Sequence, residues 1–238
     1  MAKELNMQFS GSIGPLVGCL RDGKYYYRSR PGKVRQTRAT KRSSNYFGLA
    51  AKAGKIIRIY LAKSIPNTKD MHMQRRLEAC ISKWLRADNG LPPKPTADIP
   101  FVNHFNFDHE LRLGEQLKIA FVFKQTGIGL TELQLPAFVP VNAVKAPPGT
   151  THLEFCISAV ALRLGDDSYY GNHSIVITIP YNDTLQDAQE IAIPLQTEPG
   201  NILAAALKMR YGVQAAGEIN YSKFESRSVA GIAGAIYL

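Results

Sequence analysis

The chain has 238 residues, of which 45% are hydrophobic, and this is enough for one or two domains with packed cores. It contains no apolar run of about 18 residues and no apolar leader. We therefore expect no membrane span and a protein that stays in the cytoplasm or leaves it by a route that needs no such signal. The charges are unevenly distributed: residues 1–90 hold 19 Lys and Arg against 5 Asp and Glu, whereas residues 91–238 hold 10 against 14. This asymmetry indicates a basic arm that meets a polyanion or an acidic protein surface.

The first predicted element is a β-hairpin whose turn is Asp22-Gly23. An Asp-Gly pair between β-forming residues favours a two-residue turn, because both turn residues need positive φ. Alternation along the strands then places apolar side chains on one face, namely Leu16, Leu20, Tyr25 and Tyr27. The opposite face carries Arg21, Lys24, Tyr26 and Arg28. Pro31-Gly32 ends the hairpin.

A first helix is predicted after the hairpin. From Tyr46 to Tyr60, apolar residues recur at spacings of three, four and seven, and Ser43 or Ser44 can cap the helix. Gly48 and Gly54 inside the helix each cost about 1 kcal/mol relative to Ala. Because glycine allows another backbone to approach closely, we interpret both glycines as packing contacts.

A second helix is predicted over Met73–Trp84, with one apolar face and an end near Asn89. The proline-rich stretch that follows is stiff and extended, which is typical of a linker between domains. The predicted organisation is a basic hairpin-plus-helices region over residues 1–90, a linker over residues 91–100 and a β-sandwich domain over residues 101–238.

The sequence beyond the linker favours β-structure, because β-forming runs alternate with Gly, Pro, Asn and Asp. About eight short strands at this spacing predict a mainly antiparallel β-sandwich, so the whole chain is assigned to the α+β class. The segment Ile202–Leu207 has three alanines and could instead be helical. The expected strands are Leu117–Lys124, Leu130–Phe138, His152–Leu164, Ser174–Tyr181, Glu190–Gln196, Ile202–Tyr211, Glu218–Phe224 and Val229–Leu238.

The last of these strands, Val229–Leu238, is apolar to its final residue. A frayed tail would be polar, so we expect this segment to be paired. It is either an inner strand of its own sandwich or a strand that adds to the sheet edge of a neighbouring copy.

The N-terminal stretch resembles a group of bacterial proteins. Gly11, Gly14 and Gly18 precede the run from Gly23 to Pro31, which reads Gly-Lys-Tyr-Tyr-Tyr-Arg-Ser-Arg-Pro. This pattern is similar to the N-terminal signature of uncharacterised Bacteroidota proteins in domain-of-unknown-function families. The likeness covers about residues 10–60. It implies no activity, cofactor or catalytic residue.

No motif predicts catalysis or metal binding. Residues 48–56 differ from a phosphate-binding loop, because they lie within a predicted helix and lack Ser or Thr after the lysine. His104 and His109 would point to opposite faces of a strand, so we interpret them as surface residues. The cysteines, Cys19, Cys80 and Cys156, show neither metal nor disulfide spacing. We expect a non-enzymatic protein without a cofactor, a metal or an evident small-molecule substrate.

The basic segment over residues 21–42 is the candidate functional site. It holds nine Lys and Arg with three consecutive tyrosines, and nucleic-acid binding uses cations for phosphates and aromatic rings for stacking. The same cations could face an acidic surface of a neighbouring subunit. The predicted interface residues are Arg21, Lys24, Tyr26, Arg28, Arg30, Lys33, Arg35, Arg38, Lys41 and Arg42. The leading hypothesis is a structural protein that self-associates into a homo-oligomer through this arm, and the alternative is a nucleic-acid-binding protein.

Overall fold

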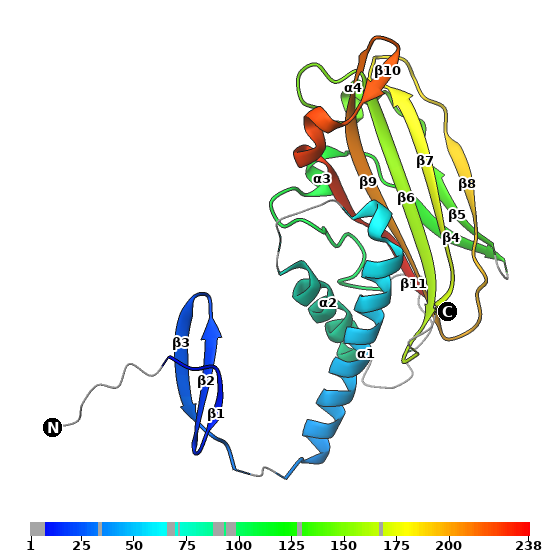
Figure 1. Ribbon diagram of the computed structural model, residues 1–238. Coiled ribbons are helices and arrows are strands. Elements are labelled where there is room, and N and C mark those ends of the chain that lie inside the picture. Colours follow the sequence, from blue (N-terminus) through cyan, green and yellow to red (C-terminus); the bar gives the residue numbers. More distant parts are fainter. Residues whose placement is uncertain are drawn as a thin grey trace. The chain divides into compact units, whose positions relative to one another are not determined.

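The computed structural model describes residues 8–32, 35–65, 70, 72–87, 93, 99–127, 130–166 and 169–238. It divides into two compact units, residues 1–42 and residues 43–238. Its helices and antiparallel sheets confirm the predicted α+β class (Figure 1). Within the described ranges, no helix is both long enough and apolar enough to span a bilayer.

The first unit is a small antiparallel sheet with the strand order β1-β2-β3. Its strands are β1 (Gly11–Ile13), β2 (Leu16–Arg21) and β3 (Lys24–Ser29). Gly14 lies in the turn between β1 and β2 with a φ of 55°, a conformation that favours glycine. The predicted hairpin is therefore confirmed, and a short third strand extends it.

Two helices follow, α1 (Arg38–Tyr60) and α2 (Met73–Ala87), with the 3-10 helix η1 (Ala62–Ser64) after α1. The cap of α1 differs from the prediction, because Thr37 precedes the helix and its Oγ1 accepts a hydrogen bond from the Thr40 N–H (3.1 Å). Gly54 is a packing contact as predicted, although with side chains instead of a backbone: a Cβ added there would lie 3.1 Å from Cγ of Glu78 on α2. The same prediction is wrong for Gly48, where an added Cβ would meet no atom within 4 Å.

A five-stranded antiparallel sheet forms the centre of the second unit (Figure 1). β9 pairs with β6 along one edge and with β10 and β11 along the other, and β7 pairs with β6. Most side chains of β9 are buried on both faces of this sheet, and for this reason its alanine-rich part is a strand instead of a helix. The strands are β6 (His152–Arg163), β7 (Tyr169–Pro180), β9 (Asn201–Ala215), β10 (Glu218–Asn220) and β11 (Val229–Tyr237).

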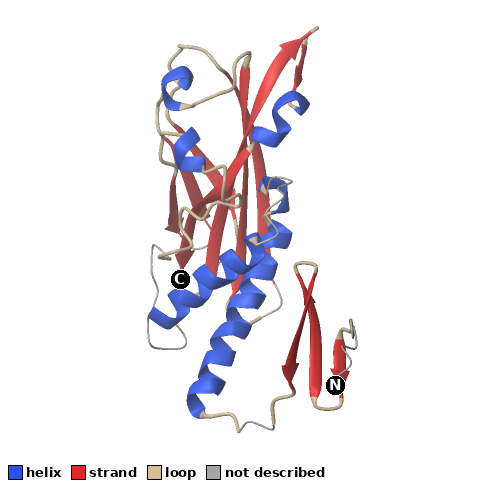
Figure 2. Ribbon diagram, turned by 90° about the vertical axis from the view of Figure 1, so that its left-hand side faces the viewer, coloured by secondary structure: helices blue, strands red, loops and turns tan. Residues whose placement is uncertain are grey.

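The central sheet is the middle of three layers (Figure 1; Figure 2). On one face, α1 and α2 bury Ile57, Leu77 and Trp84 in a core that includes Val160 and Ala204. On the other face lies a second sheet with the order β4-β5-β8, made of β4 (Val122–Gly127), β5 (Leu130–Leu135) and β8 (Gln189–Pro194). The two sheets share a second apolar core, as the predicted sandwich requires.

The division of the chain differs from the predicted boundary at residues 91–100, of which 91–92 and 94–98 lie outside the described residues. Both helices belong mainly to the same unit as the sheets. The physical reason is that the helices need a surface for their apolar faces, and the central sheet provides it. The rings of Trp84 on α2 and Tyr237 on β11, for example, pack edge to face with centroids 5.5 Å apart.

Some strand boundaries also differ from the prediction. The strand expected at 117–124 begins only at Val122, because the short helix α3 (Leu113–Gln116) and an isolated bridge at Leu117 come first. The strand expected at 174–181 belongs to the longer β7. The strand expected at 218–224 ends at Asn220, whose side chain accepts a hydrogen bond from the Ser222 N–H (2.8 Å) and turns the chain into η2 (Ser222–Arg227). A further short helix is α4 (Pro140–Ala143).

The C-terminal strand β11 is paired on both edges, which confirms that it is not a frayed tail. β9 covers one edge. The segment over residues 99–107 covers part of the other, where the N–H groups of His104 and Phe107 donate to carbonyl oxygens of Ile232 and Ala230 (both 3.1 Å). β11 is therefore an inner strand of its own unit.

Candidate interface on the N-terminal sheet

The β2–β3 hairpin has the predicted register. Asp22 and Gly23 form the turn with φ values of 51° and 74°, and Arg21 pairs with Lys24 and Leu20 with Tyr25. Successive side chains therefore alternate between two faces as the sequence predicted. One face is apolar and the other is basic.

The apolar face is exposed. Its large side chains retain between 37% and 56% of their accessible surface, and we define this apolar face as Ile13, Leu16, Leu20, Tyr25 and Tyr27. Phe9 covers only its centre: the Phe9 and Tyr27 rings lie 5.3 Å apart, and a Cβ at Gly18 would collide with the Phe9 carbonyl oxygen. The strands of this unit are therefore too short and too open to bury a core of their own.

Sequence reasoning missed β1 and the role of Phe9. The signal was present, because Phe9, Gly11 and Ile13 alternate with polar residues in the way a strand requires. The glycines hid it, since glycine contributes no side chain to a period-two pattern.

The opposite face, which we call the basic face, consists of the four predicted residues Arg21, Lys24, Tyr26 and Arg28. All four are exposed. Arg21 lies 3.8 Å from the neighbouring Asp22, a surface pair that solvent and salt screen. No described carboxylate pairs with Lys24 or Arg28. The Tyr26 ring between these cations is available for contact with a partner.

The remaining predicted residues lie farther along the chain. Arg30 follows β3, and its N–H donates to the Pro15 carbonyl oxygen (2.6 Å). Arg35 precedes α1, whereas Lys33 lies outside the described residues. Arg38, Lys41 and Arg42 are in the first turns of α1. The structure thus brings four of the ten predicted residues together on one face and places three others on the start of a helix.

The start of α1 is electrostatically unfavourable as it stands. A helix N-terminus carries partial positive charge and favours acidic side chains, yet the first turn of α1 has none and begins with Arg38. An anionic partner would relieve this unfavourable charge. The helix start therefore has the same preference for a negative surface as the basic face.

The Asn103–His109 stretch contributes to the second unit, and its two histidines have separate environments. His109 Nδ1 lies 3.7 Å from Oδ2 of Asp70, whose side chain is only 3% exposed, and Arg76 donates to the same oxygen (2.6 Å). Burial raises the pKa of Asp70, but the hydrogen bonds from Arg76 and from the His72 N–H outweigh it and hold the pKa below its usual value. This arrangement fastens residues 106–107 to α2, because Arg76 also donates to the Asn106 and Phe107 carbonyl oxygens.

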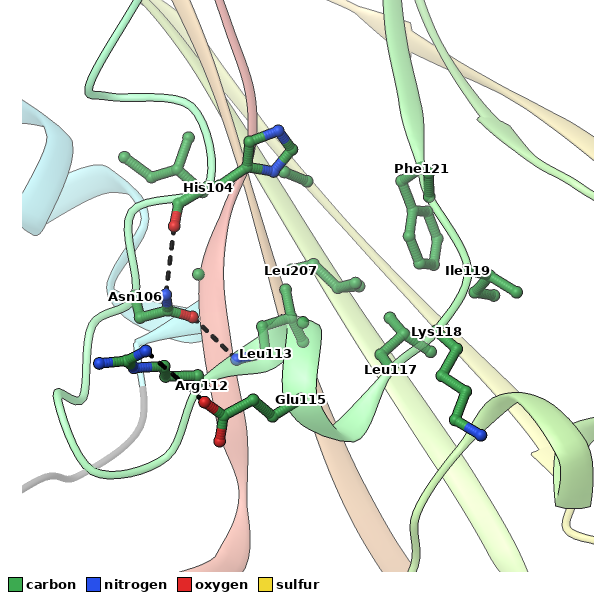
Figure 3. Close-up of a pocket in the computed structure, with 15 residues that line it drawn as sticks. His104, Asn106, Arg112, Leu113, Glu115, Leu117, Lys118, Ile119, Phe121 and Leu207 are labelled. Atoms are coloured by element: carbon green, nitrogen blue, oxygen red, sulfur yellow. Dashed lines mark hydrogen bonds and ion pairs between the residues drawn. The ribbon is translucent and has the colours of Figure 1, made fainter.

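His104 lines a cleft of about 450 Å³ beside β11 (Figure 3). His104 and Phe121 are drawn on opposite sides of this cleft, and Lys118 extends away from both. The Asn106 amide is engaged by its surroundings, since it donates to the His104 carbonyl oxygen and accepts from the Leu113 N–H. Arg112 and Glu115 form an ion pair at 3.6 Å. Asn106, Arg112 and Glu115 in the lining of this cleft therefore already have partners within the protein.

Comparison with protein-family models, with curated proteins and with solved structures gave no significant match.

Proposed function

We propose that this chain is a structural protein that self-associates by docking the apolar face of its N-terminal sheet on another copy. The observation that carries the proposal is the exposure of five large apolar side chains on a sheet without a core of its own. Fully burying one such side chain contributes about 1.5–3 kcal/mol, so a partner that covers the face would stabilise the sheet and the complex together.

The distribution of charge also favours another copy of the chain as the partner. The N-terminal sheet and the start of α1 are basic, whereas residues 91–238 carry more Asp and Glu than Lys and Arg. A second copy therefore offers the carboxylates of residues 91–238 to the basic arm, on a second unit that is nearly neutral as a whole, with 19 Lys and Arg against 17 Asp and Glu over residues 43–238. Such complementarity sets orientation and association rate more than affinity, and the apolar face supplies most of the affinity.

The decisive experiment compares the two faces of one sheet in the full chain. The apolar-face variant is Leu16→Thr/Leu20→Thr, and the matched control is Val17→Thr/Cys19→Thr on the opposite face of the same strand. Threonine keeps β-propensity in both. After nuclease treatment, sedimentation velocity across micromolar concentrations should show a smaller species for the apolar-face variant only. A wild-type protein that is monomeric throughout, or an equal effect of both variants, contradicts the proposal.

The second candidate function is binding of single-stranded nucleic acid, and the basic face favours it. Tyr26 stands exposed among Arg21, Lys24 and Arg28, which provides a ring for stacking beside cations for phosphates. The variant Arg21→Gln/Lys24→Gln/Arg28→Gln should reduce the slope of log affinity against log salt by about two units. Binding of single-stranded oligonucleotides with an unchanged slope would exclude this face as the site.

A further inference from the structure

We propose that β7 is a second self-association site, at which the β7 strands of two copies pair antiparallel and join their central sheets. The proposal goes beyond the N-terminal sheet, because β7 belongs to the second unit and has its own surface. It starts from the outer edge of β7. Among the described residues, β7 pairs with β6 on one side, and no backbone hydrogen bond covers the other side.

An open edge of this kind needs protection, because it offers a row of N–H and C=O groups to any passing strand. Native sheets protect edges with short strands, lysine, proline, bulges or a covering segment. β7 spans residues 169–180 without a single Lys, Arg, Asp or Glu. It has a register irregularity near Tyr169 and a proline at position 180, but Gly171–Ile179 between them pairs regularly with β6. Val176 in this stretch is 58% exposed.

The other described edges of the second unit are protected. β4 carries Lys124, and β8 carries Glu190 and ends at Pro194. β10 has three residues, and residues 99–107 cover part of β11. This contrast sets β7 apart as an edge that the fold leaves open.

A second β7 is the occupant that fits this edge. The edges of the N-terminal sheet are β1, with three residues, and β3, with six residues that include Lys24 and Arg28. Neither matches the length and neutrality of β7, and β7 offers no carboxylate to their cations. Two copies of β7 match in length and bring no like charges together. A twofold axis normal to the sheet keeps each face on its own side, so Val176 would lie beside an even-numbered residue of the other copy.

The test adds charge to this face of β7 in the full chain. The variant Asn172→Lys/Val176→Lys places two lysines on exposed positions of each strand, and its matched control, Val122→Lys/Thr126→Lys, has the same spacing on β4. Like charges across a strand pair are destabilising, so the β7 variant should weaken association about tenfold or more at low salt, while the control behaves as wild type. Mixing the lysine variant with an equal amount of the complementary variant, Asn172→Glu/Val176→Glu, should restore association.

The outcomes separate this proposal from the proposed function. If the apolar-face variant of the N-terminal sheet still forms a dimer, and the β7 lysines dissociate that dimer, the β7 pairing stands whatever the role of the arm. If the apolar-face variant alone yields a monomer at all micromolar concentrations, the β7 pairing is wrong and arm docking accounts for the assembly. Unchanged association of the lysine variant, or no recovery on mixing with the glutamate variant, also overturns it.

Discussion

The two units of this chain differ in how far their large apolar side chains are buried. The second unit buries residues such as Phe155 and Leu203 completely between layers, whereas Leu20 and Tyr27 of the first unit are 54% and 46% exposed. The second unit is therefore stabilised by its own packed cores, whereas the first unit needs contacts with another surface. Four experiments test this difference between the units, and they are given in order of decreasing expected effect.

The largest effect is expected in the core between the two sheets. Phe155 is fully buried and packs edge to face against Phe121 and Phe138. Phe155→Ala should therefore lower the free energy of unfolding by about 3–5 kcal/mol. At concentrations too low for association, Leu20→Ala should change it by less than about 0.5 kcal/mol. Urea denaturation followed by circular dichroism measures both. Similar losses for the two variants would mean that the first unit has a core after all.

A second effect depends on alkaline pH. Burial raises the pKa of Tyr211 to about 12, and its hydroxyl donates to the Lys145 carbonyl oxygen (3.3 Å). Because the folded-state pKa is above the unfolded value of about 10, this contribution is fully present below pH 10 and is lost as the pH rises towards 12. The loss should reach roughly 2–3 kcal/mol. Tyr211→Phe should flatten the alkaline limb of the stability curve, and a limb as steep as wild type contradicts the prediction.

A smaller effect is expected where the helices meet the sheet. The Ser64 hydroxyl after α1 is buried and lies 2.8 Å from Ser158 Oγ and 3.0 Å from the Cys156 carbonyl oxygen on β6. Ser64→Ala should cost about 1 kcal/mol, because Ser158 keeps its contact with Ser174 (3.0 Å). Thermal unfolding with Ser43→Ala as an exposed control should resolve the difference. A loss no larger than that of the control would show that this contact does not hold the layers together.

The smallest effect concerns the surface of the second unit. Arg112 and Glu115 form an exposed pair at 3.6 Å. Arg112→Gln should change the free energy of unfolding by less than about 0.5 kcal/mol, and added salt should remove the difference. A larger, salt-independent loss in urea denaturation would indicate that the cleft beside β11 depends on this residue for its shape.

Sequence reasoning predicted local features better than the assembly of layers. The turn at Asp22-Gly23 and the faces of the hairpin follow from local geometry, and the structure has both. Of the two helix glycines expected at packing contacts, only Gly54 has one, because the position of α2 decides which part of α1 is covered. The linker boundary differed because composition cannot show that Trp84 on a helix packs against Tyr237, which is 153 positions away in the chain.

The sequence alone also could not predict that β7 is an open edge strand. An exposed strand and a covered strand share the same alternating pattern, and only the strand order reveals which is outermost. The basic residues were visible as a cluster, but their division between a sheet face and the start of α1 required the three-dimensional arrangement.

The position of β9 between β6 and β11 affects how the chain can fold during its synthesis. Ile202–Met209 of β9 pairs with β6, which is synthesised earlier, and with β11, which emerges from the ribosome later. Until residues 229–237 have been released, one edge of an apolar strand has no partner and the helices lack part of their cover. Nascent chains halted before this point should therefore expose a strand edge that attracts chaperones or other nascent copies.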